Sequence, residues 1–449
     1  MYHTPFHLMA NPLHETCDPA ITSWVESAAA ADGDFPLQNL PFASFRENRQ
    51  ASPWRIGVAI GNRVLDLAGA AEDGLLDTLP PDVLQAAHGA TLNGVIALGV
   101  RTVGAVRHAV HRLLRADAAR PVQTRVARHL LDAEAIEYRL PASVGNFTDF
   151  FASAFHAGNV ARLRNPDAEL PSNYSHAPLA YHGRASSLVV SGTTVPRPRG
   201  PRRGSVAPTY QPTERLDYEV ELGLLIGQGS TFGTPVGISA ARSHLVGACL
   251  LNDWSARDIQ AFESQPLGPF LSKSFATTLS PWMVTVQALE PFRRPAAPRP
   301  EGTPAAMRHL LDDEDQAAGA WSVTVEAWLT TRTMREMYLS PFRLSVADAA
   351  SLFWTPAQLV THQTSNGCNL HTGDLLATGT ISGPEPGSFG SLLEITRGGR
   401  EPLILPTGER RGFLEDDDEV TLRAYCSAPG AARIGFGECR GRIAPTSPL

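Results

Sequence analysis

One segment near the middle of the chain alternates between apolar and polar residues. In LDYEVELGLLIG, residues 216–227, every second position is apolar, and the first four intervening positions hold Asp217, Glu219, Glu221 and Gly223. A period of two predicts a β-strand whose carboxylates lie on the face opposite the apolar side chains. Like charges this close repel unless water or a cation lies between them. The segment therefore fits either a solvent-facing polar stripe or a site for a hard cation such as Ca²⁺ or Mg²⁺.

A second segment changes from a strand pattern to a helical one. The apolar run of residues 248–251 stops at Asn252, and a polar pattern with helical spacing follows Asp253 directly, which places Asp253 where a strand gives way to a helix. Arg257 and Gln260 are three residues apart and share one face of that helix. Lys273 is expected on a new extended segment after a Gly-Pro break. These groups fit either an ordinary surface helix or a functional site at a strand end.

The N-terminal half of the chain predicts a hairpin followed by helices. RIGVAIGNRVLDL, residues 55–67, contains two apolar runs separated by Gly61-Asn62, which is typical of a β-hairpin. Residues 82–131 have helical spacing instead, and their His108 and His111 are interpreted as surface residues. This half therefore combines a small β-rich unit with a helical segment.

Further strands and one well-marked helix are predicted in the C-terminal half. SVTVEAWLTT, residues 322–331, EVTLRAYC and RIGFGECRGRI have strand patterns, and Thr355 begins a helix with an N-cap hydroxyl, a first-turn proline and an N3 glutamine. SFGSLLEI is interpreted as another strand, which would contain Glu394. Thr380 lies in a turn rich in glycine and hydroxyl groups. Thr380 could donate to a ligand and Glu394 could orient a histidine, or both could have only turn and strand roles.

The patterns divide the chain into three parts. Residues 1–33 have no clear period and form an arm, residues 34–140 form a small domain with a helical segment, and residues 141–449 form a larger domain. A chain of 449 residues is too long for one simple core, which agrees with a large domain and a small one. The boundary falls where the helical pattern gives way to a segment that contains proline and glycine.

Composition narrows the classes of partner. The net charge is -7 and there is no sustained run of Lys or Arg, which argues against nucleic acid and an anionic membrane surface. No apolar run approaches the roughly twenty residues of a membrane helix, so a soluble protein without a targeting segment is expected. The five cysteines have no CxxC spacing, so we expect reduced thiols in a cytosolic protein and neither disulfides nor a zinc site. With nucleic acid and membranes disfavoured as partners, a small molecule is the expected partner.

Two more residues are candidates for chemistry near the start of the larger domain. Asp149 and His156 are seven residues apart, close to two helical turns, and this spacing can bring a metal ligand and a base to one side of a helix. Alone, the pair fits equally a helix cap and a surface imidazole. The basic, proline-rich residues 195–213 fit either a cover over an anionic ligand or a solvated connector.

Taken together, the motifs resemble one known family. In order from Phe35 to the C-terminus they are FPLQNLPF, RIGVAIG, TDF followed by His156, YHGRASSLVVSGT, the strand with two glutamates, NDWSARDIQ, PLGPFLSKSF, NGCNL, GDLLATGTISG and SFGSLLE. This series is similar to the fumarylacetoacetases of the fumarylacetoacetate hydrolase family. Ten motifs in the right order are far more specific than any one of them.

The resemblance implies a fold, an activity and an assembly. The implied fold is mainly β with α, with a small SH3-like β-barrel N-terminal domain and a larger mixed β-sandwich roll. The implied activity is hydrolysis of the carbon–carbon bond of 4-fumarylacetoacetate, a small diketo acid, to fumarate and acetoacetate, the last step of tyrosine and phenylalanine degradation. A cytoplasmic homodimer that uses Ca²⁺, Mg²⁺ or both is implied as well.

The resemblance also implies residue roles. The acidic ligands of the cation would be Asp149, Glu219, Glu221 and Asp253. A second Mg²⁺ site would involve Asp253, Lys273 and Thr277, the last two through backbone oxygens because an ammonium cannot bind a cation. His156 would take a proton from water, Glu394 would orient the imidazole, and the developing oxyanion would be held by Arg257, Gln260 and Lys273.

The substrate-binding positions depart from the family pattern. By similarity they fall on Phe151, Arg164, Tyr181, Gln260, Ser264 and Thr380. Phe151 and Ser264 stand where the family has tyrosines, and Arg164 lies one residue closer to His156 than expected, with Arg162 as an alternative. The two missing phenol groups suggest a second hypothesis, a hydrolase or lyase of the same superfamily that acts on a different diketo or acylpyruvate acid. A third is a non-catalytic β-sandwich module with structural calcium.

Overall fold

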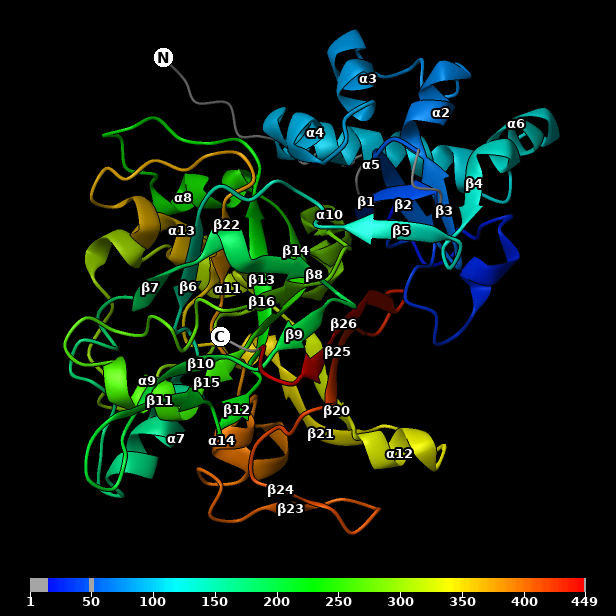
Figure 1. Ribbon diagram of the computed structural model, residues 1–449. Helices are drawn as coiled ribbons and strands as arrows, with labels where there is room; N and C mark the ends of the chain where they lie inside the picture. The colour runs from blue at the N-terminus through cyan, green and yellow to red at the C-terminus, as the bar shows by residue number, and fades with distance from the viewer. Residues whose placement is uncertain (1–14, 48–51, 448–449) are drawn as a thin grey trace, which may run out of the picture.

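The computed structural model describes residues 15–47 and 52–447, and it is mainly β with α, as the resemblance implied. A small N-terminal unit of one sheet and several helices lies beside a larger C-terminal unit of two sheets (Figure 1). The described residues contain no helix long and apolar enough to cross a membrane. All five cysteines are free thiols, as expected from their spacing.

The N-terminal sheet is antiparallel and curls into a half-barrel. Its order is β4-β3-β2-β1-β5, and its strands are β1 (Phe42–Glu47), β2 (Arg55–Ile60), β3 (Arg63–Asp66), β4 (Leu130–Asp132) and β5 (Ile136–Arg139). The predicted hairpin of β2 and β3 is present, and Gly61 takes a φ of 56° at its turn. The edge strands β4 and β5 are joined by only residues 133–135. The sheet must curl because so short a connection cannot span its full width.

Five helices of the N-terminal unit follow in the region predicted to be helical or directly before it. They are α2 (Leu67–Glu72), α3 (Pro81–Ala87), α4 (Asn93–Ala97), α5 (Val100–Leu114) and α6 (Arg120–Val126). The interpretation of His111 as a surface residue is wrong, because its side chain is fully buried on α5. Burial and the nearby guanidinium of Arg107 lower the pKa of His111 to about 4. It therefore belongs to the core in its neutral form.

The larger unit is built on a mixed eight-stranded sheet. Its main order is β7-β6-β22-β13-β14-β16-β8, and β17 also pairs with β14. The strands are β6 (Phe147–Phe150), β7 (Ala180–Gly183), β8 (Leu188–Val190), β13 (Val220–Ile226), β14 (Leu245–Asp253), β16 (Thr277–Leu279), β17 (Val284–Thr285) and β22 (Leu375–Ala377). The pairs β22–β6 and β16–β8 are parallel, and the others are antiparallel.

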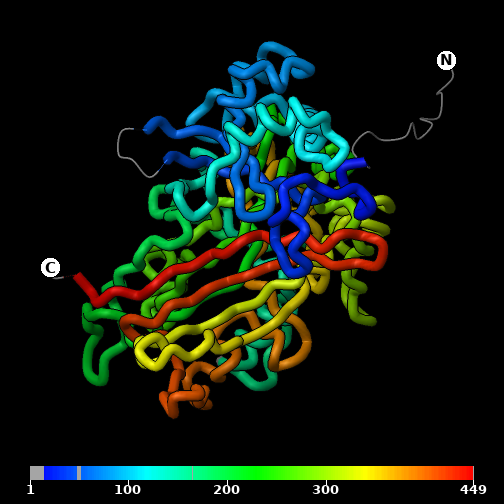
Figure 2. The backbone as a smooth tube through the Cα atoms, turned by 90° about the vertical axis from the view of Figure 1, so that its right-hand side faces the viewer, coloured from blue at the N-terminus to red at the C-terminus, as the bar shows by residue number. Residues whose placement is uncertain are grey.

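A five-stranded sheet packs against this one. It has the order β21-β20-β25-β26-β9, with β9 (Thr194–Pro196), β20 (Thr324–Thr330), β21 (Phe342–Asp348), β25 (Glu419–Cys426) and β26 (Ile434–Ala444). The long strands of its yellow and red segments run side by side across the molecule in Figure 2. Three of these strands confirm the predictions for residues 322–331 and for the two closing segments.

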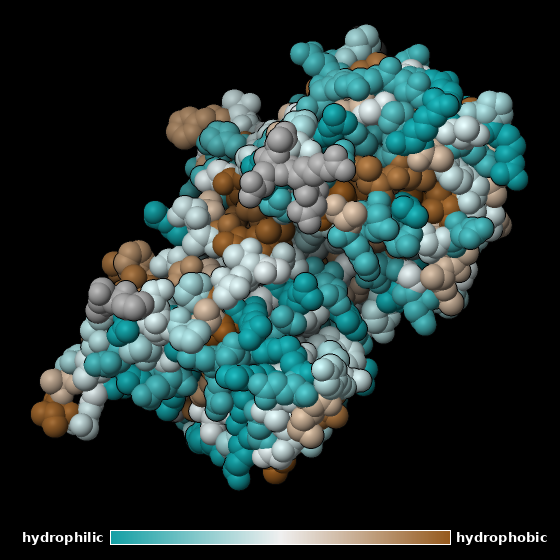
Figure 3. All heavy atoms as spheres, turned by 45° about the vertical axis from the view of Figure 1, so that its right-hand side comes forward, coloured by the Kyte–Doolittle hydropathy of each residue, from teal (hydrophilic) through white to brown (hydrophobic). Residues whose placement is uncertain are grey.

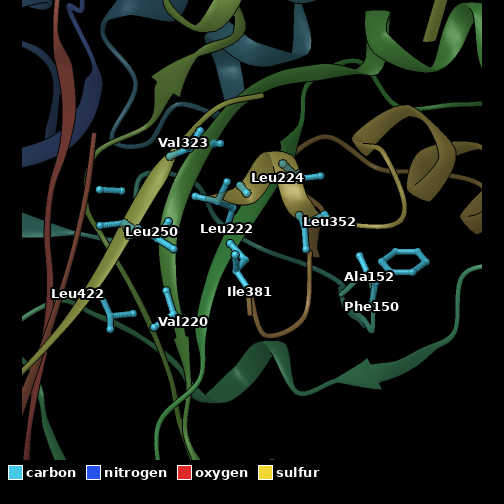
Figure 4. Close-up of a cluster of buried hydrophobic side chains, with 14 of the residues drawn as sticks. Phe150, Ala152, Val220, Leu222, Leu224, Leu250, Val323, Leu352, Ile381 and Leu422 are labelled. Carbon is cyan, nitrogen blue, oxygen red and sulfur yellow. The ribbon is translucent and has the colours of Figure 1, made fainter. Parts of the chain in front are cut away.

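Side chains from the two sheets form the main core. Leu222 and Leu224 of β13 and Leu250 of β14 face Leu422 of β25 and Val323, which directly precedes β20 (Figure 4). The opposite face of the eight-stranded sheet is covered by the N-terminal unit, where residues such as Leu225 pack against the helices. Both faces of β13 are therefore buried. Figure 3 shows hydrophilic side chains over much of the molecular surface, with hydrophobic side chains gathered in a few patches.

The carboxylate-bearing segment differs from the prediction in two ways. It is not one continuous strand, because β12 (Leu216–Asp217) pairs with β15 (Ser255–Ala256) and β13 starts again at Val220. Its carboxylates also do not face solvent, since Asp217, Glu219 and Glu221 are all at most 5% exposed. A solvated polar stripe is thereby excluded, and these buried charges must be paired or bound.

The remaining elements connect the sheets and carry part of the site. The helices are α7 (Ala154–Arg164), α8 (Ile238–Ala241), α9 (Arg257–Glu263), α10 (Val286–Leu289), α11 (Asp313–Ala318), α12 (Arg332–Glu336), α13 (Pro356–Thr364) and α14 (Leu392–Ile395). Short strand pairs are β10 (Arg199–Arg202) with β11 (Thr209–Pro212), β18 (Arg293–Arg294) with β19 (Ala320–Trp321), and β23 (Leu403–Ile404) with β24 (Arg410–Arg411). The basic residues 195–213 thus form a β-hairpin and the strand before it.

The predicted start of α13 is confirmed and gives a test of stability. The Gln358 N–H donates to Thr355 Oγ1 at 3.2 Å, and the Thr355 N–H donates to Gln358 Oε1 at 3.0 Å. The same hydroxyl donates to Asp315 at 2.7 Å. We expect Thr355→Ala to lower the free energy of unfolding by about 1 to 2 kcal/mol, because a cap and a buried acceptor lose their partner. Thr355→Ser keeps the hydroxyl and should lose clearly less in the same denaturant titration.

Candidate active site

Four carboxylates from three strands of the large sheet meet at one point. Asp149 lies on β6, Glu221 on β13, Glu219 directly before β13, and Asp253 at the end of β14. One oxygen of each can be chosen so that all four lie within 4.8 Å of one another, and all four residues are buried. The structure thus brings together the acids that were expected to bind a cation. Sheet pairing explains this, because β6, β22, β13 and β14 are adjacent.

The cluster fits a divalent cation. Asp149 Oδ1 and Glu221 Oε1 are buried and accept no hydrogen bond from any described residue. Burial and the neighbouring carboxylates raise the pKa of both Asp149 and Glu221 well above its ordinary value. Clustered carboxylate oxygens without donors are the ligands that Ca²⁺ and Mg²⁺ prefer. A bound cation would supply the missing partner and allow these groups to ionise.

Two buried cations neutralise the other side of the cluster. Lys273 Nζ donates to Glu219 at 2.5 Å and to Asp253 at 2.6 Å, and Arg257 Nη1 lies 2.7 Å from Glu219. Burial alone would raise the pKa of Glu219, but Lys273 and Arg257 outweigh it and lower that pKa. Burial likewise opposes the charge of Lys273, but Asp253 and Glu219 raise its pKa. Glu219 is therefore an ionised member of the cluster.

Asp253 is held by three donors. Besides Lys273, it accepts from the Tyr181 hydroxyl at 2.6 Å and from Thr277 Oγ1 at 2.8 Å. Lys273 lies in a turn before β16 and not on an extended segment as predicted, because the residues after α9 fold into successive turns. The side chains of Lys273 and Thr277 thus both serve Asp253. A second Mg²⁺ site through their backbone oxygens stays a prediction.

Asp217 belongs to a different network. Its carboxylate accepts from Arg257 Nε at 2.8 Å and from the Leu392 and Leu393 N–H groups at 2.8 and 3.0 Å. It therefore ties β12 to the first turn of α14 and fixes the guanidinium of Arg257. Sequence alternation grouped Asp217 with the other two carboxylates, but the break between β12 and β13 separates their roles.

His156 forms a buried pair with Glu394. The imidazole Nδ1 lies 2.7 Å from Glu394 Oε2, and both side chains are almost fully buried. Glu394 also accepts from Asn159 at 2.8 Å, Ser391 at 2.8 Å and Ser382 at 3.0 Å. Burial opposes ionisation of Glu394, but His156 and these hydrogen bonds lower its pKa. The carboxylate is thus charged and fixed beside the imidazole.

Local structure around this pair corrects two sequence predictions. Glu394 lies on the short helix α14 and not on a strand, because Ser391 caps that helix by accepting the Glu394 N–H. His156 lies on α7, whereas Asp149 lies on β6, so the two do not share a helix. The Ser-x-x-Glu spacing before Glu394 was the signal that would have predicted the cap. Asn159 follows His156 by three residues on the same helix, so its contact with the same carboxylate could also have been predicted.

One pocket of about 730 Å³ is lined by members of both groups, although Asp253 and Glu394 lie behind its lining residues. The carboxylates Asp149, Glu219 and Glu221 line it together with His156, Phe151, Tyr181, Arg257, Gln260, Lys273 and Thr380. The ring of Phe151 meets the His156 ring edge-on at a centroid distance of 5.3 Å. The pocket thus combines a base, a candidate cation site and several donors, which is a combination suited to hydrolysis.

The structure does not place two of the predicted substrate-binding residues, Ser264 and Arg164, in the pocket, nor Arg162, the alternative to Arg164. Ser264 does not line the pocket, and its hydroxyl donates to the backbone carbonyl of Gln260 at the end of α9. The side chain of Arg164 lies outside the described residues. Arg162, the alternative, donates to Asn159 and does not line the pocket either. Three arginines that line the pocket were not predicted from the sequence: Arg215, Arg397 and Arg400.

Fold and site together define a two-domain, mainly β protein of hydrolase type, with an acidic cluster and a His–Glu pair in one pocket. The family model for the fumarylacetoacetate hydrolase C-terminal domain matches residues 146–444, and that for the fumarylacetoacetase N-terminal domain matches residues 38–141. The chain belongs to the fumarylacetoacetase family.

Two similar proteins agree with this assignment. The chain is 40% identical to a fumarylacetoacetase of Arabidopsis thaliana over 425 residues, which cover 93% of this chain and 97% of that protein. It is 41% identical to the Homo sapiens fumarylacetoacetase over 424 residues, with the same coverage. A solved fumarylacetoacetate hydrolase from Exiguobacterium antarcticum is more distant, with 16% identity, a TM-score of 0.48 and coverage of 90% of this chain and 99% of that one.

Proposed function

We propose that the protein hydrolyses the carbon–carbon bond of 4-fumarylacetoacetate to fumarate and acetoacetate, the last step of tyrosine and phenylalanine degradation. Its family membership over most of the chain supports this assignment. The observation that carries it is the joint placement of the His156–Glu394 pair and the four-carboxylate cluster around one pocket. The reaction needs a base for water, donors for an oxyanion and positive charge for the leaving enolate.

His156 is proposed to activate the water. With Nδ1 donating to the Glu394 carboxylate, the other ring nitrogen carries no proton and can accept one. Water loses that proton to His156 as its oxygen bonds to the substrate carbonyl carbon. Glu394 then stabilises the imidazolium that forms, which is possible because its lowered pKa keeps it ionised.

Arg257, Gln260 and Lys273 are proposed to stabilise the oxyanion. Arg257 Nη2 is buried and donates to no acceptor among the described residues, so it has an N–H available for a ligand. Gln260 Oε1 accepts from Arg257 Nη1 at 3.2 Å, which leaves the amide group of Gln260 to donate. When the tetrahedral intermediate collapses, the carbon–carbon bond breaks and its electron pair passes to the departing enolate. The proton that His156 took from water is then transferred to the enolate carbon, which completes acetoacetate and restores the neutral imidazole.

A divalent cation is proposed as cofactor, held by Asp149, Glu219, Glu221 and Asp253. Their unpartnered, buried oxygens support this role. Bound there, Ca²⁺ or Mg²⁺ would supply positive charge for the two oxygens of the diketone and for the enolate. The four carboxylates would hold the cation, while Lys273 and Tyr181 hold Asp253 in position.

A hydrolase or lyase for a different diketo or acylpyruvate acid is the second candidate. Phe151 supports it, because this pocket residue offers no hydroxyl where the family pattern has one. A panel of 3,5-diketo acids and acylpyruvates, assayed with Mg²⁺ or Ca²⁺ by loss of the diketone absorbance, separates the two. We expect the highest kcat/KM for fumarylacetoacetate. No turnover of it by protein with bound cation would refute the proposed function, and a higher kcat/KM for an acylpyruvate would favour the second candidate.

We further propose a cytoplasmic homodimer, on the basis of the family resemblance. The free thiols agree with a reducing compartment. Light scattering on a size-exclusion column should give the mass of two chains. A monomer that has full activity would contradict this assembly.

A further inference from the structure

The pocket has two zones of opposite charge. Its interior contains the acidic cluster, and its lining also includes the three arginines Arg215, Arg397 and Arg400. All three are exposed, unlike the buried Arg257 and Lys273 that neutralise the cluster. These three residues are called the arginine rim below. Neither the acidic cluster nor the His156–Glu394 pair uses any of their guanidinium groups.

Arg215 has a guanidinium that is available to a ligand. Within the described chain, no acceptor or carboxylate pairs with it, and its only ring contact is with Phe413, 5.9 Å from the ring centroid. Its backbone is fixed, because its carbonyl accepts the Arg257 N–H at 2.9 Å. The charged side chain of Arg215 is therefore available to a ligand, while its backbone is fixed beside Arg257, one of the proposed oxyanion donors.

Arg397 lies three residues after Glu394 and has an unusual backbone. Its φ is 49°, and Gly398 and Gly399 follow with φ of 71° and 83°. A non-glycine residue in the left-handed region is disfavoured, and such positions concentrate at functional sites. Arg400 Nε donates to the Arg397 carbonyl at 2.9 Å and closes the turn. Among the described residues, the side chain of Arg397 pairs only with Glu401, at 3.2 Å between two exposed side chains, a pair that contributes little.

Phe413 links the two parts of the rim. A Cβ on Gly399 would lie 2.9 Å from Phe413 Cε2, so the turn packs directly on the ring that Arg215 also contacts. Asp217, which follows Arg215 by two residues, adds a second link, because its carboxylate accepts the N–H groups of Leu392 and Leu393 on α14. The segment of Arg215, directly before β12, and the turn that carries Arg397 are thus held next to each other.

We propose that Arg215 and Arg397 bind the carboxylate at the acyl end of the substrate and so select dicarboxylic diketo acids. This inference rests on the proposed function. Guanidinium groups suit carboxylates because their planar donors match two oxygens at once. The acyl end is favoured because Arg397 is on the same short segment as Glu394, whose partner His156 is the proposed base for the water that attacks the acyl carbonyl. The arginine rim also gives the pocket a site for an anion that is separate from the acidic cluster.

The first test compares substrates and variants. The substrates are fumarylacetoacetate and its analogue with an amide in place of the acyl-end carboxylate, and the variants are Arg215→Gln, Arg397→Gly and the control Arg410→Gln. Arg410 is exposed on β24 and does not line the pocket. We expect KM for the dicarboxylate to rise about tenfold in each rim variant, with kcat nearly unchanged, and KM for the amide to stay constant. Equal losses for both substrates, or none, would overturn the proposal.

Arg397→Gly also separates function from stability. Glycine adopts the left-handed conformation freely, so this variant should melt at the same temperature as the parent or higher while its KM rises. A lower melting temperature together with a lower kcat would mean that Arg397 acts on the fold and would contradict its role in binding.

A second test does not depend on turnover. Calorimetric titration of fumarate into the Mg²⁺-loaded protein should show weaker binding in Arg215→Gln than in Arg410→Gln, and the difference should shrink at high salt. Fumarate binding that is the same in both variants refutes the arginine rim even if fumarylacetoacetate is hydrolysed. Binding that depends on Arg215 in a protein that does not turn over fumarylacetoacetate would support the rim and refute only the proposed reaction.

Discussion

His156→Ala is expected to lower kcat by about a thousandfold, within the range that loss of a general base usually produces. Its imidazole is the pocket base that is fixed by a carboxylate, so water would have to lose its proton without a positioned acceptor. The fold should tolerate the change, since Glu394 keeps the donors Asn159, Ser382 and Ser391. Steady-state kinetics at saturating cation measures the effect.

Controls separate a lost base from a disturbed site. His182→Ala removes an exposed imidazole on β7 that does not line the pocket, and its kcat should equal that of the parent. Cation affinity of His156→Ala, measured by calorimetry, should be close to that of the parent because all four carboxylates remain. If His156→Ala keeps more than about a tenth of the parent kcat, the base is another group. A binding module with structural calcium would show no turnover in any of these proteins.

Glu394→Gln tests the orienting carboxylate separately. The amide cannot stabilise an imidazolium, and its NH₂ group would favour the tautomer with Nδ1 unprotonated. We therefore expect kcat to fall at least about a hundredfold with little change in KM. This loss should not add to that of His156→Ala in the double variant, because the two residues act as one unit.

Several features could be predicted because a local pattern carries them. Alternation around Glu219 and Glu221 predicted close carboxylates, the apolar run before Asp253 predicted a strand end, and the residues after Thr355 predicted a helix cap. Each depends on residues within one turn or one strand, where period and capping chemistry decide the structure. The order of ten motifs then indicated the family.

Other features depend on contacts between distant segments, and sequence spacing could not supply them. His111 has helical surroundings typical of a surface residue, but the fold places it in the core. The separation of Asp217 from Glu219 follows from the pairing of β12 with β15, which breaks the strand. The rim was missed because Arg215 and Arg397 are 182 positions apart in the sequence, and their segments are joined through contacts with Phe413 and Asp217 that spacing does not reveal.

Removal of divalent cations is expected to abolish turnover and to destabilise the protein more at high pH than at low pH. Without a cation, burial and mutual repulsion raise the pKa of Asp149 and Glu221 above the values of the unfolded chain. Below their unfolded pKa, both states are protonated and the cost is absent. As the pH rises towards the folded pKa, the folded protein retains protons that the unfolded chain has lost, so stability falls.

Glu219 does not reverse this trend. Although burial opposes its ionisation, Lys273 and Arg257 lower its pKa, so its contribution is gained above its unfolded pKa and lost only as the pH falls towards its folded pKa. Between about pH 5 and about pH 8 that contribution is constant. His111, whose lowered pKa makes stability rise with pH up to its unfolded pKa, contributes equally with and without a cation. The difference in slope between the two conditions is therefore set by Asp149 and Glu221.

Melting temperatures with a chelator and with Mg²⁺ or Ca²⁺ across this window measure the effect. The cation replaces the retained protons, so the increase in melting temperature on adding it should grow with pH. At a concentration about 100 times its Kd, a cation contributes about 2.7 kcal/mol, a shift of several degrees for a chain of this size. An increase that does not depend on pH would show that Asp149 and Glu221 do not bind the cation.

Glu221→Gln is the matched variant for this experiment. The amide oxygen can still accept the Gly379 N–H, which donates to Glu221 at 3.1 Å, while one of the repelling charges is removed. In the presence of chelator, the variant should lose less stability than the parent as the pH rises. With cation, its melting temperature should increase less and its turnover should fall at least about a hundredfold, because one of four ligands has lost its charge. Unchanged cation affinity in Glu221→Gln would place the ion elsewhere and remove the basis for its role at the diketone.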